Sequence, residues 1–556
     1  MEKRILRTVA VLVCLAAAAV TAAAMGAQGG GTAGAGNAAK LFASGAAKPN
    51  TLANMTNTIK LPIAKEKITF KVMSWQEGGQ AVPRGQFLTY QELEKRTNVH
   101  VEWIEAPGEK YTEFFTGVFA GGTNLPDMAV VEGDWTRVNR NLLAFAAAGM
   151  IVPLENLIVK NAPDLKAFLD RRPDVRKLLT APDGHIYTIP SVSTNESFYY
   201  AHIVRQDWLD KLKLKAPDTI DDWIAVLKAF RDGDPNGNGL KDEIQLLEGG
   251  PAGIIEWGPF KAAYGLLLNY GGGWAVDKGT ISYAWLSPKA KDYVALLKRL
   301  YTESIFRREE FDDPEFPGKW SELLFSGRTG IASYGVYDVN PNGIYQSMKD
   351  PAAKWTQVLD AKGPDGTRVQ ENAGVLNANN FVITKNCKDP VAAIKWIDYW
   401  YATKDGYLLS VYGIEGETFK MVEGRPVSLL GTEAGAAATK KWETTRLPDG
   451  PIPHLSLEDE NWANLKFPET AAFVALAKPF MFNTSALKDV IATTAESETF
   501  TKYWDGLWGY QNEMISKFVT GKEPMENWDT FVAQLKKLGA EEVTKAKQAQ
   551  YDRATK

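Results

Sequence analysis

Strand and helix alternate along the chain from residue 65 onward, and this alternation constrains the fold more than any other feature of the sequence. KITFKVMSW alternates apolar and polar residues like a strand, and FLTYQELEKRTN follows with the apolar spacing of a helix. VHVEWIEA, YTEFFTGVFAGG and PDMAVVE then continue as strand, helix and strand. Because this alternation is typical of a parallel sheet covered by helices, we predict an α/β fold.

The same pattern returns later in the chain. In APDTIDDWIAVLKAF, the residues Ile220, Trp223, Ile224, Leu227 and Phe230 share one helical face, behind a start marked by Pro217, Thr219 and Asp222. NNFVITKNCKDPVAAIKWIDYW repeats strand and helix, and the last hundred residues are predicted as helices, the final one heavily charged. At 556 residues the chain is long enough for two or more lobes.

The N-terminus has the pattern of an export signal. Lys3, Arg4 and Arg7 precede the apolar run VAVLVCLAAAAV, and small residues suited to cleavage follow. We therefore predict a signal peptide over residues 1–27 and a flexible Gly/Ala/Asn/Thr-rich linker over residues 28–64. Val13 before Cys14 argues against a lipid anchor, so the exported protein is expected to be periplasmic, or more generally extracytoplasmic. Without the signal, Cys387 is the only cysteine and cannot form an intramolecular disulfide.

The stretch DPNGNGLKDEIQ (234–245) predicts a calcium loop, because an oxygen ligand falls at nearly every second position. Gly239 stands at the sharp sixth position, but Gln245 occupies the twelfth, where an EF-hand needs a bidentate Glu. Glu243 can supply the closing carboxylate instead. The alternative is an Asn/Gly turn with surface acids, which leaves the regular oxygen spacing unexplained. The predicted ligands of a structural Ca²⁺ in loop 234–243 are Asp234, Asn236, Asn238, Leu240 (through its carbonyl), Asp242 and Glu243.

No catalytic motif stands out. The four histidines, His100, His185, His202 and His454, lack the spacing of zinc ligands, and no G-x-S-x-G elbow occurs. YGGGW lacks the Lys-Ser/Thr of a phosphate loop. A net charge of −4 argues against a nucleic-acid partner. We therefore expect a binding protein and not an enzyme, although 67 acidic residues leave paired carboxylates for glycoside hydrolysis open.

Several stretches together resemble family 1 extracellular solute-binding proteins of carbohydrate ABC importers, in the branch of alginate-oligosaccharide-binding proteins. The most specific is RQDWLDKLKLKAPDTIDDWIAVLKAFRDGDPNGNGLKDEI, which combines a DWLDKL helix with the calcium loop. The others are ELEKRTNVHVEW, LPDMAVVEGDW, PDLKAFLDRRPDVRKLLTAPDGHIYTIPSV, GRTGIASYG and SVYGIEGETF. The resemblance runs from about residue 65 to residue 419 and weakens through the C-terminus.

The resemblance implies a periplasmic-binding-protein-like fold (type II, Venus flytrap), with two discontinuous α/β lobes, a ligand cleft between them and a helical C-terminus. The expected boundaries are residues 65–192 and 357–413 for lobe 1, and residues 193–356 and 414–556 for lobe 2, which carries the calcium loop away from the cleft. It further implies a monomer that captures an oligosaccharide and delivers it to the permease of an ABC transporter. Arg84, Arg137 and Arg140 would suit an acidic sugar.

Family analogy and the chemistry of sugar recognition, in which aromatic faces stack on C–H surfaces, together indicate the ligand-binding residues. They are Trp75, Gln76, Glu132, Asp134, Trp135, Trp257, Trp274, Tyr334 and Tyr337. For each aromatic residue the alternative is packing in the core. A secreted carbohydrate-active enzyme and a binding protein for a non-sugar solute such as a peptide remain the alternative functions.

Overall fold

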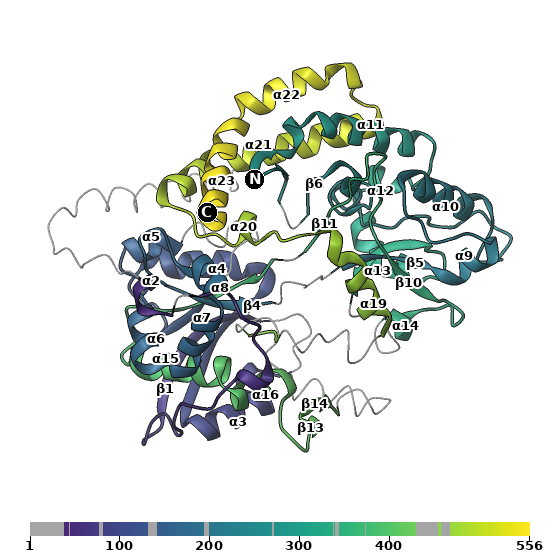
Figure 1. Ribbon diagram of the computed structural model, residues 1–556. Coiled ribbons are helices and arrows are strands. Elements are labelled where there is room, and N and C mark those ends of the chain that lie inside the picture. Colours follow the sequence, from purple (N-terminus) through teal and green to yellow (C-terminus); the bar gives the residue numbers. More distant parts are fainter. Residues whose placement is uncertain are drawn as a thin grey trace, which may run out of the picture. The chain divides into compact units, whose positions relative to one another are not determined.

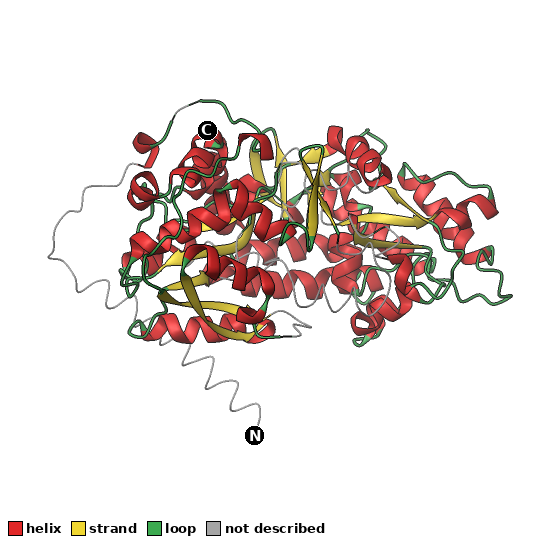
Figure 2. Ribbon diagram, turned by 90° about the horizontal axis from the view of Figure 1, so that it is seen from below, coloured by secondary structure: helices red, strands yellow, loops and turns green. Residues whose placement is uncertain are grey.

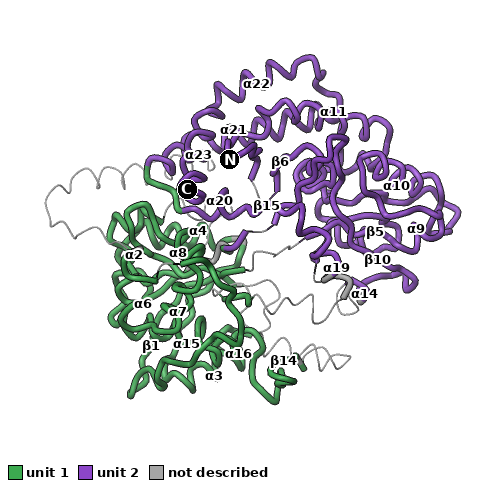
Figure 3. The backbone as a smooth tube through the Cα atoms, viewed as in Figure 1, with its two compact units in different colours: residues 1–193, 376–459, 491–494 green, residues 194–375, 460–490, 495–556 purple. Residues whose placement is uncertain are grey.

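The chain forms two compact units, each built from separate stretches of sequence (Figure 3). The computed structural model describes residues 38–43, 45–76, 82–131, 142–193, 200–269, 272–336, 339, 344–372, 374–429, 454–457 and 468–556. Unit 1 comprises residues 1–193, 376–459 and 491–494, and unit 2 comprises residues 194–375, 460–490 and 495–556.

The first boundary lies within one residue of the expected one, and the second differs. Residues 357–375 belong to unit 2, and residues 414–459 belong to unit 1. The reason is strand pairing, because β10 (Trp355–Val358) pairs with β5 (Tyr200–Arg205), and β11 (Gln370–Glu371) pairs with β15 (Met481–Phe482), all within unit 2. β10 thus pairs with an earlier strand of unit 2, and β11 pairs with a strand that follows the passage of the chain through unit 1.

Unit 1 is built on a five-stranded sheet with the order β2-β1-β3-β12-β4. The strands are β1 (Ile68–Gln76), β2 (Val99–Pro107), β3 (Met128–Val131), β4 (Ile189–Val192) and β12 (Leu376–Ile383). β1 runs parallel to β2 and β3, as the strand–helix alternation predicts, whereas β12 runs antiparallel to β3 and β4. β12 enters the sheet after the excursion through unit 2, so local alternation in the sequence could not reveal its direction.

Helices cover both faces of this sheet (Figure 1). Tyr111 and Phe115 of α4 (Gly108–Gly121) and Leu142 of α5 (Leu142–Ala147) pack with Val382 on one face. On the other face, Phe381 lies against two tryptophans of α15 (Pro390–Ala402). The remaining elements of unit 1 are α2 (Ala38–Leu41), α3 (Leu88–Thr97), α6 (Glu155–Asn161), α7 (Pro163–Arg171), α8 (Pro173–Leu179), α16 (Lys404–Tyr412), β13 (Phe419–Val422) and β14 (Arg425–Ser428).

The segment before β1 is fastened to unit 1, unlike the flexible linker expected over residues 28–64. We call its residues 38–63 the N-terminal strap. Phe42 is buried beneath the cationic groups of Lys166 and Arg176, which lie 5.8 and 5.4 Å from its ring centroid. The buried Asp164 carboxylate accepts backbone N–H bonds from Thr58 at 2.9 Å and from Ile59 at 3.0 Å. Composition indicated flexibility here because most of these contacts are made by the backbone, which composition does not report.

Unit 2 combines two three-stranded sheets with a large helical layer (Figure 2). The antiparallel sheet β10-β5-β9 contains β9 (Ile331–Gly335), and the sheet β6-β7-β8 contains β6 (Leu266–Leu267), β7 (Trp274–Asp277) and β8 (Thr280–Tyr283). The helices are α9 (Gln206–Leu212), α10 (Ile220–Asp232), α11 (Pro288–Thr302), α12 (Glu309–Asp312), α13 (Trp320–Phe325), α14 (Ile344–Ser347), α19 (Pro468–Ala477), α20 (Ser485–Lys488), α21 (Thr494–Thr520), α22 (Trp528–Lys537) and α23 (Ala540–Thr555).

The C-terminal helices complete the core of unit 2. Trp504 and Phe518 of α21 and Phe531 of α22 belong to the same hydrophobic cluster as Tyr293 and Leu297 of α11. Figure 1 shows α21 and α22 beside α11. The predicted helical C-terminus is therefore confirmed. Across the described part of the chain, every helix is too short or too polar to cross a bilayer.

Candidate functional site

An aromatic pair with one exposed ring lies in unit 2. Trp257 closes a π-helical turn, Gly253–Trp257, and π-turns occur often at functional sites. Its ring meets the Tyr200 ring edge-on, with centroids 5.3 Å apart and planes at 88°. Tyr200 is 49 % exposed, unusual for a tyrosine at the start of a strand that is otherwise buried. We call these two residues the Tyr200–Trp257 pair.

Sequence reasoning selected Trp257 but missed Tyr200. Tyr200 follows the stretch STNESFY, where nothing in the residue pattern separates an exposed ring from a core ring. Strand periodicity offers one signal for the direction of the Tyr200 side chain, because it places Tyr200 on the same face of β5 as His202. Both face the side of the sheet that carries the main core of unit 2.

Trp274 lies in the core of unit 2, which fits the packing alternative. It is 2 % exposed, stacks on Trp504 with centroids 5.9 Å apart, and meets Tyr283 edge-on at 5.7 Å. The stretch YGGGW placed this tryptophan after a loop, but it is the first residue of β7 and turns inward. We therefore no longer include Trp274 among the ligand-binding residues.

Tyr334 lies on the opposite face of the β10-β5-β9 sheet from Tyr200. Tyr334 is opposite Ala201, whereas Tyr200 is opposite Gly335, so the two tyrosines alternate in direction. The Tyr334 ring stacks on Trp320 with centroids 6.2 Å apart and planes at 11°. The structure therefore does not bring Tyr334 together with Trp257.

In unit 1, Trp75 and Gln76 end strand β1, as predicted. Trp75 is partly buried and meets Tyr111 edge-on at 5.8 Å, while Gln76 is exposed. Arg84 is buried and pairs with Glu105 at 2.9 Å, so it is not available to a uronate. Six other residues proposed from the sequence lie outside the described part of the chain: Glu132, Asp134, Trp135, Arg137, Arg140 and Tyr337.

A network of buried charges lies within unit 2, on the strand and turns that carry the aromatic pair. The His202 ring bonds Asp360 at 2.7 Å and Glu248 at 3.1 Å. Burial alone would lower the pKa of His202, but these two carboxylates outweigh it and raise the pKa to about 9. Lys261 lies 3.6 Å from Asp360 and 3.2 Å from Glu371, so both cations stand between carboxylates.

Glu256 adds a fourth carboxyl group, in the same π-turn as Trp257. Burial and the charge of Glu371 raise the pKa of Glu256 to about 8. Its side chain is partly exposed and accepts no hydrogen bond from the described residues. At neutral pH Glu256 therefore holds a proton, and a solute hydroxyl can bond to its carboxyl group.

The predicted calcium loop is folded around its own oxygen atoms. The Asp234 carboxylate accepts N–H bonds from Asn238 and Gly239, both at 3.1 Å, and Asn238 Oδ1 accepts one from Leu240 at 2.7 Å. Gly237 and Gly239 have φ of 74° and 76°, which glycine adopts most easily. These turns direct side-chain oxygens to the inside of the loop, as a cation site requires.

The far end of the loop carries an uncompensated acid. Both Glu243 carboxylate oxygens are buried and have no hydrogen-bond partner among the described residues. Burial and the neighbouring charges of Asp234 and Asp242 raise the pKa of Glu243. A buried carboxyl group left in this state is costly unless a cation neutralises it. The predicted donors are all oxygen atoms, the ligand type that Ca²⁺ takes, and a cation beside Glu243 would neutralise this carboxyl group.

Among the described residues, no three His, Cys, Asp or Glu side chains converge on a metal site. The three carboxylates of the predicted set, Asp234, Asp242 and Glu243, therefore do not converge on one point in this structure. Asp242 Oδ1 instead accepts amide N–H bonds from Asn236 at 3.2 Å and from Asn238 at 3.0 Å. A cation bound here would compete for the same carboxylate oxygen.

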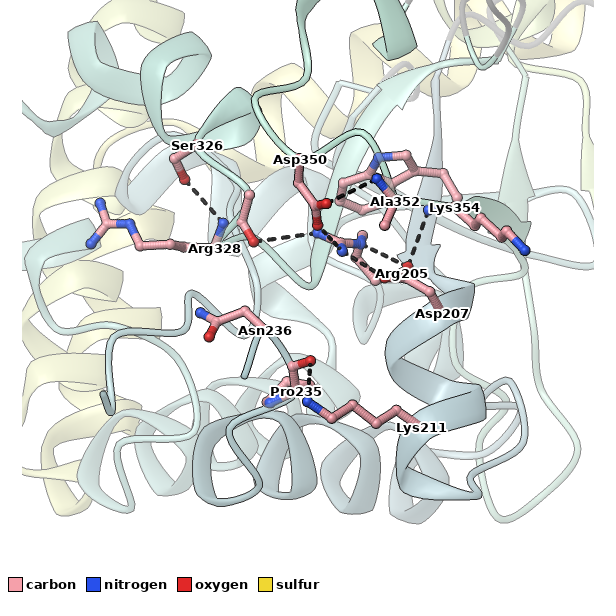
Figure 4. A network of polar contacts seen from close by, with 12 residues as sticks. Arg205, Asp207, Lys211, Pro235, Asn236, Ser326, Arg328, Asp350, Ala352 and Lys354 are labelled. Atoms are coloured by element: carbon pink, nitrogen blue, oxygen red, sulfur yellow. Dashed lines mark hydrogen bonds and ion pairs between the residues drawn. The ribbon is translucent and has the colours of Figure 1, made fainter. Parts of the chain in front are cut away.

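Contacts from the surrounding unit hold the loop in place (Figure 4). Lys211 of α9 donates from Nζ to the carbonyl of Pro235 at 3.0 Å, and Arg328 lies 3.6 Å from Asp242. Nearby, the buried Arg205 bonds both Asp207 and Asp350 at 2.6 Å. The loop is therefore anchored to α9 and to the segment before β9.

The groups that could serve catalysis are engaged or buried. Burial raises the pKa of Cys387 to about 12, so its thiol is a poor nucleophile. Ser191 lies 3.4 Å from His454 Nδ1, but Ser191 is fully buried and accepts the backbone N–H of His454. His185 pairs with the buried Glu155 at 2.7 Å, and His100 pairs at 2.7 Å with Glu94, which also bonds Lys67.

The fold and this site define a class of protein. Two discontinuous α/β units, with an antiparallel strand inserted into a mainly parallel sheet, are typical of type II periplasmic binding proteins. A family model described as bacterial extracellular solute-binding protein matches residues 53–407, which is more than half of the chain. The chain belongs to this family.

Individual relatives agree with this assignment. The chain is 26 % identical over 513 residues to the fructooligosaccharide ABC transporter substrate-binding protein FusA of Streptococcus pneumoniae, covering 88 % of this chain and 91 % of FusA. It is 25 % identical over 370 residues to the polygalacturonan/rhamnogalacturonan-binding protein YtcQ of Bacillus subtilis, covering 64 % and 67 %.

Solved structures show the same fold. The alginate-binding protein AlgQ2 without calcium ion superposes with a TM-score of 0.70 at 24 % identity, covering 88 % of this chain and 99 % of AlgQ2. An EF-hand mutant of S. pneumoniae FusA in complex with fructo-nystose superposes with a TM-score of 0.68 at 24 % identity, covering 87 % and 99 %. The predicted family and the predicted fold class are thus confirmed.

Proposed function

We propose that this protein captures an oligosaccharide outside the cytoplasm and delivers it to the permease of an ABC transporter. The observation that carries the proposal is the Tyr200–Trp257 pair, in a chain that belongs to a solute-binding family. Rigid aromatic rings remove the C–H faces of a sugar from water at little cost in side-chain entropy. FusA and YtcQ, whose names state carbohydrate ligands, support the choice of an oligosaccharide.

The protein acts by binding and not by turnover. Cys387 and Ser191 are buried, and His100, His185 and His202 are paired with carboxylates, which supports this part of the proposal. The N-terminal export signal directs the chain across the membrane, and the exported protein works as a monomer. Trp75 and Gln76 at the end of β1 contribute ligand contacts from unit 1.

The test is calorimetry of the purified exported chain against neutral and acidic oligosaccharides and against peptides. We expect micromolar or tighter binding of at least one oligosaccharide, no binding of peptides, and no release of reducing ends on long incubation. Binding of peptides alone, or release of new reducing ends, would overturn the proposal.

The loop 234–243 binds a structural Ca²⁺ through Asp234, Asn236, Asn238, the Leu240 carbonyl, Asp242 and Glu243. The uncompensated Glu243 carboxylate supports this site, because a divalent cation would neutralise it together with the charges of Asp234 and Asp242. The ion supplies positive charge and cross-links the loop, while the chain's own glycines and Asn turns position the oxygens. Equilibrium dialysis with ⁴⁵Ca²⁺ should give one site per chain, and a stoichiometry near zero would exclude it.

A further inference from the structure

The charges around the Tyr200–Trp257 pair restrict which sugar can bind there. Six titratable side chains form one connected group in this part of unit 2: the two cations His202 and Lys261, and the four acids Glu248, Asp360, Glu371 and Glu256. Acids outnumber cations by two to one. Even when Glu256 holds its proton, the group retains one excess negative charge.

Neither cation is available to a ligand. The side chains of His202 and Lys261 are each 4 % exposed, and each lies between two carboxylates. A carboxylate on an incoming sugar would have to leave water without gaining a counter-ion from this group. It would also be repelled by the excess negative charge.

Glu371 connects the network to the turn that carries Trp257. Its carboxylate lies 3.2 Å from Lys261 Nζ and accepts the backbone N–H of Asn269 at 3.3 Å. Its charge also acts on Glu256, the residue next to Trp257. Glu256, the acid next to Trp257 in the chain, is therefore coupled through the charge of Glu371 to the buried Lys261.

We infer that the sugar residue held at the Tyr200–Trp257 pair is electrically neutral, and that the network of Glu256, Glu371 and their partners excludes uronates from this position. The inference rests on the proposed function, because it assumes that the aromatic pair binds an oligosaccharide. It decides between the two kinds of ligand named for FusA and YtcQ, since a fructooligosaccharide is neutral and a polygalacturonan is a polyanion. The engagement of Arg84 with Glu105 in unit 1 points the same way.

Selectivity of this kind comes from a repulsive element and not from added contacts with the favoured ligand. Removing negative charge should therefore relax the exclusion more than it weakens binding of the neutral sugar. Glu371→Gln is the most informative change, because it removes one acid and leaves Lys261 with Asp360 as its only carboxylate partner. Asp529→Asn is the matched control, since Asp529 is an exposed acid on α22 of the same unit.

The experiment measures affinities for neutral trisaccharides (kestose, maltotriose and a milk-type trisaccharide) and for anionic ones (trigalacturonate and an alginate trisaccharide). We expect the tightest ligand of the wild-type chain to be neutral and at least 100-fold tighter than either uronate. In Glu371→Gln the ratio of neutral to anionic affinity should fall at least tenfold, and in Asp529→Asn it should stay within twofold. A melting curve of each variant confirms that the folded chain is being measured.

Glu248→Gln gives a second measurement if Glu371→Gln does not fold. It removes another acid of the network and leaves His202 paired with Asp360, so the ratio of neutral to anionic affinity should again fall at least tenfold. A uronate as the tightest wild-type ligand would overturn the inference while leaving the proposed function intact. If the folded wild-type chain bound none of the sugars, the proposed function itself would fail, and the inference with it.

Discussion

At the scale of single residues, the aromatic side chains separate into two kinds that the sequence could not distinguish. Trp257 and Trp274 both follow glycine- or proline-rich stretches and look alike as candidates. In the structure, Trp257 lies beside the exposed ring of Tyr200, whereas Trp274 stacks on Trp504. The difference arises from tertiary packing, because the partner of Trp274 comes from a helix more than 200 residues away in the chain.

Replacing each tryptophan with alanine should therefore have opposite effects. Trp257→Ala should weaken sugar binding by roughly 1.5–3 kcal/mol, the range for an apolar side chain removed from contact. Its free energy of unfolding should change little. Trp274→Ala should lower the free energy of unfolding by about 3–5 kcal/mol, because it leaves a cavity in the core. Calorimetry and urea unfolding of both variants measure the two quantities, and loss of stability without loss of affinity in Trp257→Ala would contradict the assignment.

At the scale of elements, periodicity predicted the first α/β stretch, the helix at residues 216–230, a late strand and helix, and the helical C-terminus. The predicted helix in residues 216–230 is α10, whose Thr219 and Asp222 form the expected capping box. The first three strands and α3 and α4 also lie where the pattern placed them. What periodicity could not give is long-range partnership: the antiparallel direction of β12, the opposite faces of Tyr200 and Tyr334, and the fastening of the N-terminal strap.

The calcium loop is the element whose chemistry was most readable, because its ligands are close in sequence. A specific prediction concerns Glu243 in this loop. In chelator, Glu243→Gln should melt at the same temperature as the wild-type chain or higher, since it replaces a buried carboxyl group without partners. Added Ca²⁺ should raise the melting temperature of the wild-type chain by mass action, and that of the variant much less.

Asp313→Asn serves as the control for this measurement, because Asp313 is an acid of the same unit outside the loop. Its response to Ca²⁺ should match that of the wild-type chain. An equal response in Glu243→Gln would show that Glu243 does not bind the ion, and no response in any chain would exclude the site.

At the scale of the whole molecule, buried acids set the dependence of stability on pH. Burial raises the pKa of Glu310 and Asp398 to about 8, and burial together with Glu371 does the same for Glu256. Between about pH 5 and pH 8 the folded chain keeps protons that the unfolded chain has lost, so the free energy of unfolding falls as pH rises. His202 acts in the same direction, because its stabilising charge is lost as pH rises through about 9.

The melting temperature in chelator should therefore decline from pH 6 to pH 9. Each of these groups contributes at most about 1.4 kcal/mol per pH unit while it titrates. Asp398→Asn should flatten part of the decline, because Asp398 accepts the N–H of Leu165 with one oxygen and leaves the other without a partner. A melting temperature that rises steadily to pH 9 would contradict these pKa directions.

A second prediction for the whole molecule concerns motion. Binding proteins of this fold class close around their ligand by a hinge, and we expect the same motion in this chain. Small-angle scattering should show a smaller radius of gyration with a saturating oligosaccharide than without it. Identical profiles, with binding verified by calorimetry on the same sample, would count against hinge closure.

The N-terminal strap has a practical consequence for any device built from this protein. Phe42 and the bonds to Asp164 fasten the start of the folded chain to unit 1, so a surface linker attached ahead of residue 38 immobilises unit 1. Unit 2, which carries the Tyr200–Trp257 pair, remains the free partner. A fluorescent dye on unit 2 would then report sugar as a change in distance from the support, which makes the N-terminus the better attachment point for a sensor.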